Sequence, residues 1–317
     1  MKIKIPTPQP TLWPSTKAGV LEVAASWMKP DRVALNDAAF AKIEAGSIKA
    51  PESTNLTIAP PTGELPVESL TQAIEYSIAM NSINYMFWSL NEDGKFIRYE
   101  KDGAVGANAM TKAFSDAWHD SFSGINLARD GIPLDAQHIE EIFGDIPDPE
   151  GRARVLNEIL VGPKLGAIAQ ELAQTAIDGG AFDVQAAARL AQAFPGAYGD
   201  AVLKKSQLAV SAMWRNAMDL GVARECELTA FADYQIPNVL RALGLLDYAS
   251  DLAETIDAQR LIAPESVDER ALRAASILAV ERLAQEHGVN VADVDYWLWT
   301  KRKEPKTPFH LTETTLY

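Results

Sequence analysis

The chain lacks the residues on which several classes of protein depend. Its 317 residues include one cysteine, Cys226, which excludes an internal disulfide and a multi-cysteine metal site. The four histidines are scattered, without the short spacings of a zinc site. No apolar run is long enough to span a bilayer, and residues 1–6 have no signal-peptide core. We therefore expect a cytoplasmic protein with no metal, no cofactor and no membrane association.

Positive charge is also scarce. There are 29 Lys and Arg residues against 43 Asp and Glu residues, which gives a formal net charge of −14. A protein that binds DNA or RNA neutralises many phosphates with Lys and Arg, so this balance argues against a nucleic-acid polymer as partner. A small anionic ligand needs only one or two local cations and is compatible with the composition.

What the chain does contain is helical periodicity. Between residues 66 and 78, apolar side chains recur at three- and four-residue steps, which is typical of one buried helix face. Helix-start signals occur at 148–150 and 266–269. The turn sequence at 91–94 predicts one small β-hairpin. The predicted fold is therefore mainly α and multi-helical, with residues 1–65 as an irregular lead-in that contains short helices.

The most informative stretch is 228–237, and within it Asp233. This carboxylate lies between Phe231 and Tyr234, and a buried Asp is costly unless it is paired or used. Pro237 suits the first position of a helix, which places Asp233 just before the helix start. Two roles remain open for it: a helix cap, or an acid aimed into a cleft.

Six segments, in the same order along the chain, resemble the signature of the queuosine salvage protein family, the queuosine 5'-phosphate N-glycosylases/hydrolases. They are 83–88, 152–158, 203–208, 228–237, the positions Glu269, Arg273 and Glu281, and 295–299. The likeness spans about residues 66–317. It departs from the family at Ala212, where the family has an acidic residue, and in the tail after Pro308, which lacks a typical Arg.

The resemblance implies a hydrolase that cleaves the N-glycosidic bond of queuosine 5'-phosphate and releases the 7-deazaguanine base queuine. The substrate would be a small-molecule nucleotide. The helical catalytic domain would cover 66–317, as one body or as two lobes at about 66–200 and 201–317. A predicted helix–turn–helix corner near Pro237 and Gly244 is analogous to that of DNA glycosylases, so we expect a DNA-glycosylase-like bundle. Two alternatives stay open: an N-glycosidase for another modified purine nucleotide or nucleoside, and a non-catalytic nucleobase-binding helical protein.

Site roles follow from the reaction. A fixed carboxylate stabilises the oxocarbenium-like transition state, and we assign this role to Asp233. Asp295 is assigned either to the polar edge of the base or to a second acid/base role. Aromatic rings and an amide suit a planar base, and the residues assigned to this pocket are Asn84, Phe87, Trp88 and Tyr234. Cations at a helix start suit a phosphate, and the residues assigned to it are Lys204, Lys205 and Gln207.

Several of these segments also have a structural interpretation. The two neighbouring aromatic residues at 87 and 88 suit a hydrophobic core, and the two lysines suit a solvated helix. For residues 152–158 we expect an amphipathic helix with its Arg and Glu side chains facing solvent. We expect Arg273 to form a structural ion pair with Glu269 or Glu281.

Overall fold

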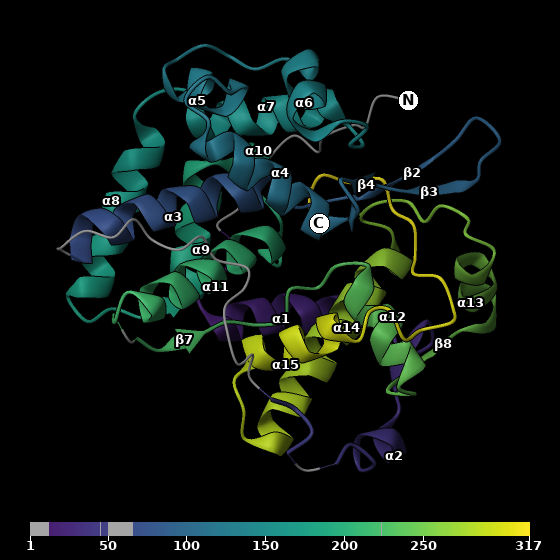
Figure 1. The fold of residues 1–317 in the computed structure, drawn as a ribbon. Coiled ribbons are helices and arrows are strands. Elements are labelled where there is room, and N and C mark those ends of the chain that lie inside the picture. The colour runs from purple at the N-terminus through teal and green to yellow at the C-terminus, as the bar shows by residue number, and fades with distance from the viewer. Residues whose placement is uncertain (1–12, 45, 50–65, 223) are drawn as a thin grey trace.

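The computed structural model describes residues 13–44, 46–49, 66–222 and 224–317. Within these ranges the chain is mainly α-helical, as predicted (Figure 1). The helices are α1 (Lys17–Trp27), α2 (Asp37–Phe40), α3 (Pro66–Ser82), α4 (Ala107–His119), α5 (Gly124–Arg129), α6 (Ala136–Phe143), α7 (Pro149–Leu160), α8 (Lys164–Ile177), α9 (Val184–Ala193), α10 (Pro195–Tyr198), α11 (Lys204–Asp219), α12 (Gln235–Ala242), α13 (Ser250–Asp257), α14 (Val267–His287) and α15 (Val291–Thr300). Much of the predicted lead-in, residues 1–12 and 50–65, lies outside the described residues.

The strands are short and pair two by two. They are β1 (Val33–Leu35), β2 (Trp88–Leu90), β3 (Phe96–Arg98), β4 (Glu100–Lys101), β5 (Ala104–Val105), β6 (Phe182–Asp183), β7 (Cys226–Glu227) and β8 (Leu246–Tyr248). The predicted hairpin is confirmed as the antiparallel pair β2–β3. The expectation of a single hairpin was wrong, because the described residues also contain the antiparallel pairs β4–β5 and β1–β8 and the parallel pair β6–β7. Strands of two or three residues are too short to show an alternating pattern in the sequence.

One group of helices is built around α3. Its apolar face, with Leu70, Ile74 and Ile78, is fully buried, and α3 packs against α8 and α11. Helices α7, α9 and α10 lie around them in the same half of the molecule (Figure 1). The helical periodicity that predicted α3 therefore corresponds to real burial.

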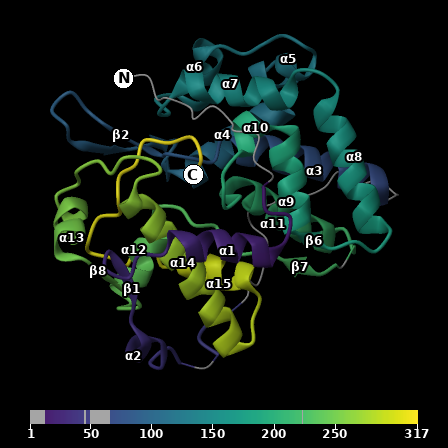
Figure 2. The ribbon, with the colours of Figure 1, turned by 180° about the vertical axis from the view of Figure 1, so that it is seen from behind.

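A second group is built around α14, which packs against α1, α12 and α15 (Figure 2). Ser266 caps the start of α14, as predicted, and Gly288 ends it with a left-handed backbone. Through α1 and the β1–β8 pair, residues from the first 65 pack onto the C-terminal part of the chain. The domain boundaries near residues 65 and 200 stay predictions.

The C-terminal tail links the two groups. It leaves α15 and returns towards the β2–β4 region, where the carbonyl of Tyr317 accepts a hydrogen bond from the N–H of Met86 at 3.3 Å (Figure 1). The functional cavity described below is lined by both groups and by this tail. Among the described helices, none is both long enough and apolar enough to cross a membrane.

Candidate active site

A cavity of about 470 Å³ collects side chains from distant parts of the chain. Its wall comes from the end of α3, the segment after it, the start of α4, helices α11 and α15, the loop before α12, and the tail. The predicted site residues that line it are Asn84, Phe87, Lys204, Asp233, Tyr234 and Asp295.

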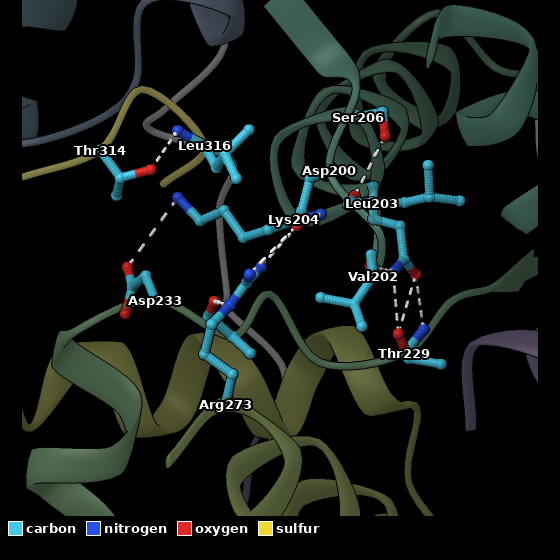
Figure 3. A network of polar contacts seen from close by, with 12 residues as sticks. Asp200, Val202, Leu203, Lys204, Ser206, Thr229, Asp233, Arg273, Thr314 and Leu316 are labelled. Atoms are coloured by element: carbon cyan, nitrogen blue, oxygen red, sulfur yellow. Dashed lines mark hydrogen bonds and ion pairs between the residues drawn. The ribbon is translucent and has the colours of Figure 1, made fainter. Parts of the chain in front are cut away.

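Asp233 is both a cap and a cavity residue. Its Oδ1 accepts hydrogen bonds from the backbone N–H groups of Gln235 at 2.7 Å and Ile236 at 3.1 Å. Its Oδ2 lies 4.0 Å from Nζ of Lys204 (Figure 3). Helix α12 therefore begins at Gln235, two residues before Pro237, which corrects the predicted start. The capping bonds fix one carboxylate oxygen, and the residue still lines the cavity.

Asp295 reaches the same cavity from α15. Its Oδ2 accepts a hydrogen bond from the backbone N–H of Phe231 at 2.8 Å, and only 5% of the residue is exposed. Burial raises the pKa of the Asp295 carboxyl to about 7, and the negative charge of Asp233 also raises it. The Phe231 N–H and the charge of Lys204 act in the opposite direction. A buried carboxyl of this kind can carry a proton near neutral pH.

Lys204 provides a cation whose charge acts on both aspartates. It is buried at the start of α11, and burial lowers the pKa of its ammonium group, while the charges of Asp233 and Asp295 oppose that shift. Its backbone N–H donates to Oδ2 of Asp200 at 2.8 Å. Leu203, directly before it, has a left-handed backbone with φ of 59°, which is strained for a branched side chain. The start of α11 is thus held in one position.

Arg273 fixes the two sides of the cavity relative to each other. Its guanidinium forms an ion pair with Asp200 at 2.6 Å, and its Nε donates to the carbonyl of Ala232 at 3.1 Å (Figure 3). The expected pair with Glu269 is present at 3.6 Å. Glu281, the other candidate, instead pairs with Lys17 at 2.8 Å. Arg273 therefore connects the Lys204 helix to the Asp233 loop.

The segment assigned to base binding meets the Asp233 loop directly. The hydroxyl of Tyr234 accepts a hydrogen bond from the N–H of Phe87 at 3.5 Å, and both residues line the cavity together with Asn84. Trp88 does not line it. Its ring is 1% exposed and stacks on Phe96, so it is a core residue of the hairpin. This placement corresponds to the structural interpretation for Trp88.

The expectation that the charged side chains of α7 face solvent was wrong for Arg152. This residue is 0% exposed, and its Nη2 donates to the carbonyls of Tyr85 at 2.7 Å and Met86 at 3.0 Å. Its Nη1 donates to the carbonyl of Ile83. Arg154, on the same helix, is exposed as expected. Arg152 is drawn inside because a distant segment offers it three carbonyl groups, and a helical pattern cannot reveal such a partner.

Two residues assigned to phosphate binding lie elsewhere. Lys205 is buried, and its Nζ donates to the carbonyl of Ser82 at 2.7 Å. Gln207 is also buried. Its Nε2 donates a hydrogen bond to the hydroxyl of Thr229 at 2.8 Å, and its Oε1 accepts one from the backbone N–H of Thr229 at 2.8 Å. Neither residue lines the cavity. Neither is exposed on a solvated helix face, which was the structural alternative to phosphate binding. Their hydrogen bonds join α11 to neighbouring segments, so we do not carry them into the proposed site.

Comparison with known proteins finds several relatives that share one name. A family model described as queuosine salvage protein matches residues 197–317. A protein from Sphaerobacter thermophilus, named queuosine 5'-phosphate N-glycosylase/hydrolase, is 28% identical over 340 residues, which cover 96% of this chain and 96% of that protein. The chain is similar to queuosine salvage proteins over almost its whole length. Proteins of the same name from Mus musculus and Schizosaccharomyces pombe are 28% and 34% identical, over 77% and 32% of this chain.

The alignment with the Sphaerobacter relative also corrects the extent of the resemblance. The sequence motifs placed it at about residues 66–317, but the Sphaerobacter relative aligns with 96% of the chain and therefore with much of the first 65 residues. This part was missed because it contains none of the six motif segments. In the structure, α1 and β1 of this part pack with α14 and β8.

Sequence reasoning also missed several arginines of the cavity wall. Arg98, Arg215 and Arg302 line the cavity, and none of them belongs to a motif segment. Arg302 lies in the turn after α15, which ends at Thr300, so helical spacing from Asp295 does not place it. No signal existed for Arg98 either, because its position depends on how the hairpin folds over the helices.

Proposed function

We propose that this protein hydrolyses the N-glycosidic bond of queuosine 5'-phosphate and releases queuine. The names of its relatives describe this activity. In this chain, the observation that carries the proposal is that Asp233 and Asp295 line one cavity together with Asn84, Phe87 and Tyr234. Two carboxyl groups in unlike surroundings, beside rings and an amide, are what cleavage of a nucleoside requires.

Asp233 acts beside the ribose. As the bond from C1′ to the base breaks, positive charge develops on the sugar, and a fixed carboxylate stabilises it. Because Oδ1 of Asp233 is held by two backbone N–H groups, the carboxylate does not have to reorganise during the reaction. Water attacks C1′ and passes a proton to Asp233.

Asp295 acts as the acid. Its pKa, raised to about 7 mainly by burial, lets it hold a proton near neutral pH and donate it to the departing base nitrogen. After the base leaves, Asp233 is protonated and Asp295 is ionised, and exchange with solvent restores both. The division of roles thus follows from two different environments within one cavity.

Asn84, Phe87 and Tyr234 bind the base in this proposal. The rings pack against its planar faces and the amide of Asn84 pairs with its polar edge. Lys204 lies 4.0 Å from Asp233, and its positive charge offsets the negative charge of the buried carboxyl groups. The substrate is a small nucleotide, and the net charge of −14 supports the view that no nucleic-acid polymer binds. A cytoplasmic location remains part of the proposal.

One observation favours a related substrate as second candidate. Ala212, where the family has an acidic residue, lies in the cavity wall. A change of charge and size at this position is suited to altering the choice of purine while leaving the two aspartates in place.

The test is to incubate the purified protein with queuosine 5'-phosphate and to follow free queuine by chromatography. We expect release of queuine, with guanosine 5'-phosphate as the control nucleotide that stays intact. Thermal stabilisation by queuosine 5'-phosphate without product would instead identify a non-catalytic nucleobase-binding protein. Cleavage of a different modified purine nucleotide, with none of queuosine 5'-phosphate, would identify the second candidate.

A further inference from the structure

Two arginines in the cavity wall have no acidic partner. Arg98 ends β3, and Arg302 follows α15. Among the described residues, neither has a carboxylate within 4.0 Å, whereas Lys204 faces Asp233 and Arg215 forms an ion pair with Asp293 at 3.4 Å. The cavity therefore holds uncompensated positive charge in a protein whose net charge is strongly negative.

Both guanidinium groups lie near aromatic rings, and that of Arg302 is held against one. The Cζ of Arg302 lies 3.4 Å from the ring centroid of Trp299, and its Nη1 donates to the Trp299 carbonyl at 2.9 Å. The Cζ of Arg98 lies 5.9 Å from the ring centroid of Phe309. Stacking of this kind limits the motion of a guanidinium and leaves N–H groups at its edge for a ligand.

The two guanidinium groups carry like charges in the wall of one cavity, Arg98 exposed and Arg302 half-buried. Burial lowers the pKa of the Arg302 guanidinium, and the positive charge of Arg98 lowers it further. Like charges held near each other without a counter-ion are unfavourable, and an anion between them removes that cost. Planar guanidinium edges match the oxygens of a phosphate in particular.

We propose that Arg98 and Arg302 together bind the 5'-phosphate of the nucleotide whose ribose lies beside Asp233. This assignment rests on the proposed function and replaces Lys204 as the main phosphate contact. A phosphate at Lys204 would stand next to the carboxylate of Asp233, which already pairs with this lysine, and would be repelled by it. Arg302 is less buried than Lys204, and the charge of Asp233 acts on it, so it is suited to the phosphate end of a nucleotide whose ribose lies beside Asp233.

The first test measures binding without catalysis. Ribose 5-phosphate and ribose are titrated calorimetrically into the wild-type protein, Arg98→Gln, Arg302→Gln and the control Lys95→Gln. Lys95 is an exposed cation of the same hairpin that does not line the cavity. We expect ribose 5-phosphate to bind the wild type more tightly than ribose does. Each arginine variant should weaken its binding about tenfold to hundredfold, the range for a charge-assisted hydrogen-bonding group. The control should change it less than about twofold.

Equal affinity of ribose 5-phosphate for the wild type and both arginine variants would overturn the proposal. So would a wild type that binds ribose 5-phosphate no more tightly than ribose.

The second test compares kcat/KM for queuosine 5'-phosphate and for queuosine. We expect the preference for the phosphorylated substrate to fall at least about tenfold in Arg98→Gln and Arg302→Gln, mainly through KM.

The two tests separate this proposal from the proposed function. If the wild type releases no queuine but the arginine variants lose ribose 5-phosphate binding, the function fails and the anion site stands. If queuine is released and the variants keep the wild-type preference, the anion site fails and the function stands.

Discussion

The backbone N–H of Phe231 donates a hydrogen bond to Oδ2 of Asp295 at 2.8 Å. This bond joins α15 to the loop that carries Asp233, so the two carboxyl groups are held at a fixed separation. It also stabilises the ionised form of Asp295, yet burial outweighs it and raises the pKa to about 7. The pair therefore combines a capped carboxylate with a buried acid, and the pH dependence of the enzyme should report on it.

The first prediction concerns the rate. Because Asp295 must be protonated to donate to the base, kcat/KM should fall as the pH rises through about 7. In Asp295→Asn the rate should drop about a hundredfold or more, and the inflection near pH 7 should disappear. The measurement is a pH profile of queuine release for both proteins. An inflection that persists in Asp295→Asn would assign it to another group.

The second prediction concerns stability. The folded-state pKa of Asp295, about 7, lies above its ordinary value of 3.8, so its contribution to folding is present at low pH and is lost as the pH rises towards 7. Asn does not ionise. Between about pH 5.5 and about pH 8, Asp295→Asn should therefore gain roughly 2 kcal/mol in free energy of unfolding relative to the wild type. Urea denaturation at both pH values checks this, and a difference that does not vary with pH would contradict it.

Local signals in the sequence were sufficient for most of the helices. The start of α14 at Ser266 and the buried face of α3 follow from capping chemistry and periodicity, which depend on neighbours within one or two turns. Asp233 and Asp295 were found because acids among aromatic residues are costly unless used, and both line the cavity.

The remaining features depend on contacts between distant segments. Arg152 was expected on a solvated helix face, and Lys205 was assigned to phosphate binding with a solvated helix face as the alternative. Each is buried because carbonyl groups at or just after the end of α3 accept its hydrogen bonds. Arg98 was missed because its place in the cavity wall depends on how the β2–β3 hairpin folds against the helices. The sequence around a charged side chain does not indicate whether a backbone carbonyl from a distant segment will accept its hydrogen bonds.

The third prediction tests the support of the base-binding segment. Arg152→Met leaves the carbonyls of Ile83, Tyr85 and Met86 without this donor, which should lower the free energy of unfolding by at least about 3 kcal/mol. Arg154→Met, on the same helix but exposed, is the matched control and should unfold like the wild type. Chemical denaturation compares the two. Equal stability of both variants would show that the buried guanidinium does not hold this segment.

The fourth prediction concerns the buried ion pair between Arg273 and Asp200. Arg273→Met leaves Asp200 and Glu269 buried without their cation, which should cost about 3–5 kcal/mol of unfolding free energy. Arg260→Met removes an exposed ion pair with Glu254 and should have little effect. A thermal or urea transition for each variant gives the comparison. A small loss in Arg273→Met would mean that the connection between α11 and the Asp233 loop does not depend on this pair.

The most direct test of the proposed mechanism is queuine release by Asp233→Asn. Asn retains an oxygen to accept the N–H groups of Gln235 and Ile236, so the start of α12 should stay capped while the negative charge is lost. Asp183→Asn is the control, because the Asp183 side chain also accepts a backbone N–H at a helix start, that of Ala186 in α9, and does not line the cavity. With queuosine 5'-phosphate as substrate, we predict a rate about a hundredfold to ten-thousandfold lower for Asp233→Asn and near the wild-type value for Asp183→Asn. Near-wild-type release of queuine by a folded Asp233→Asn protein would contradict the account.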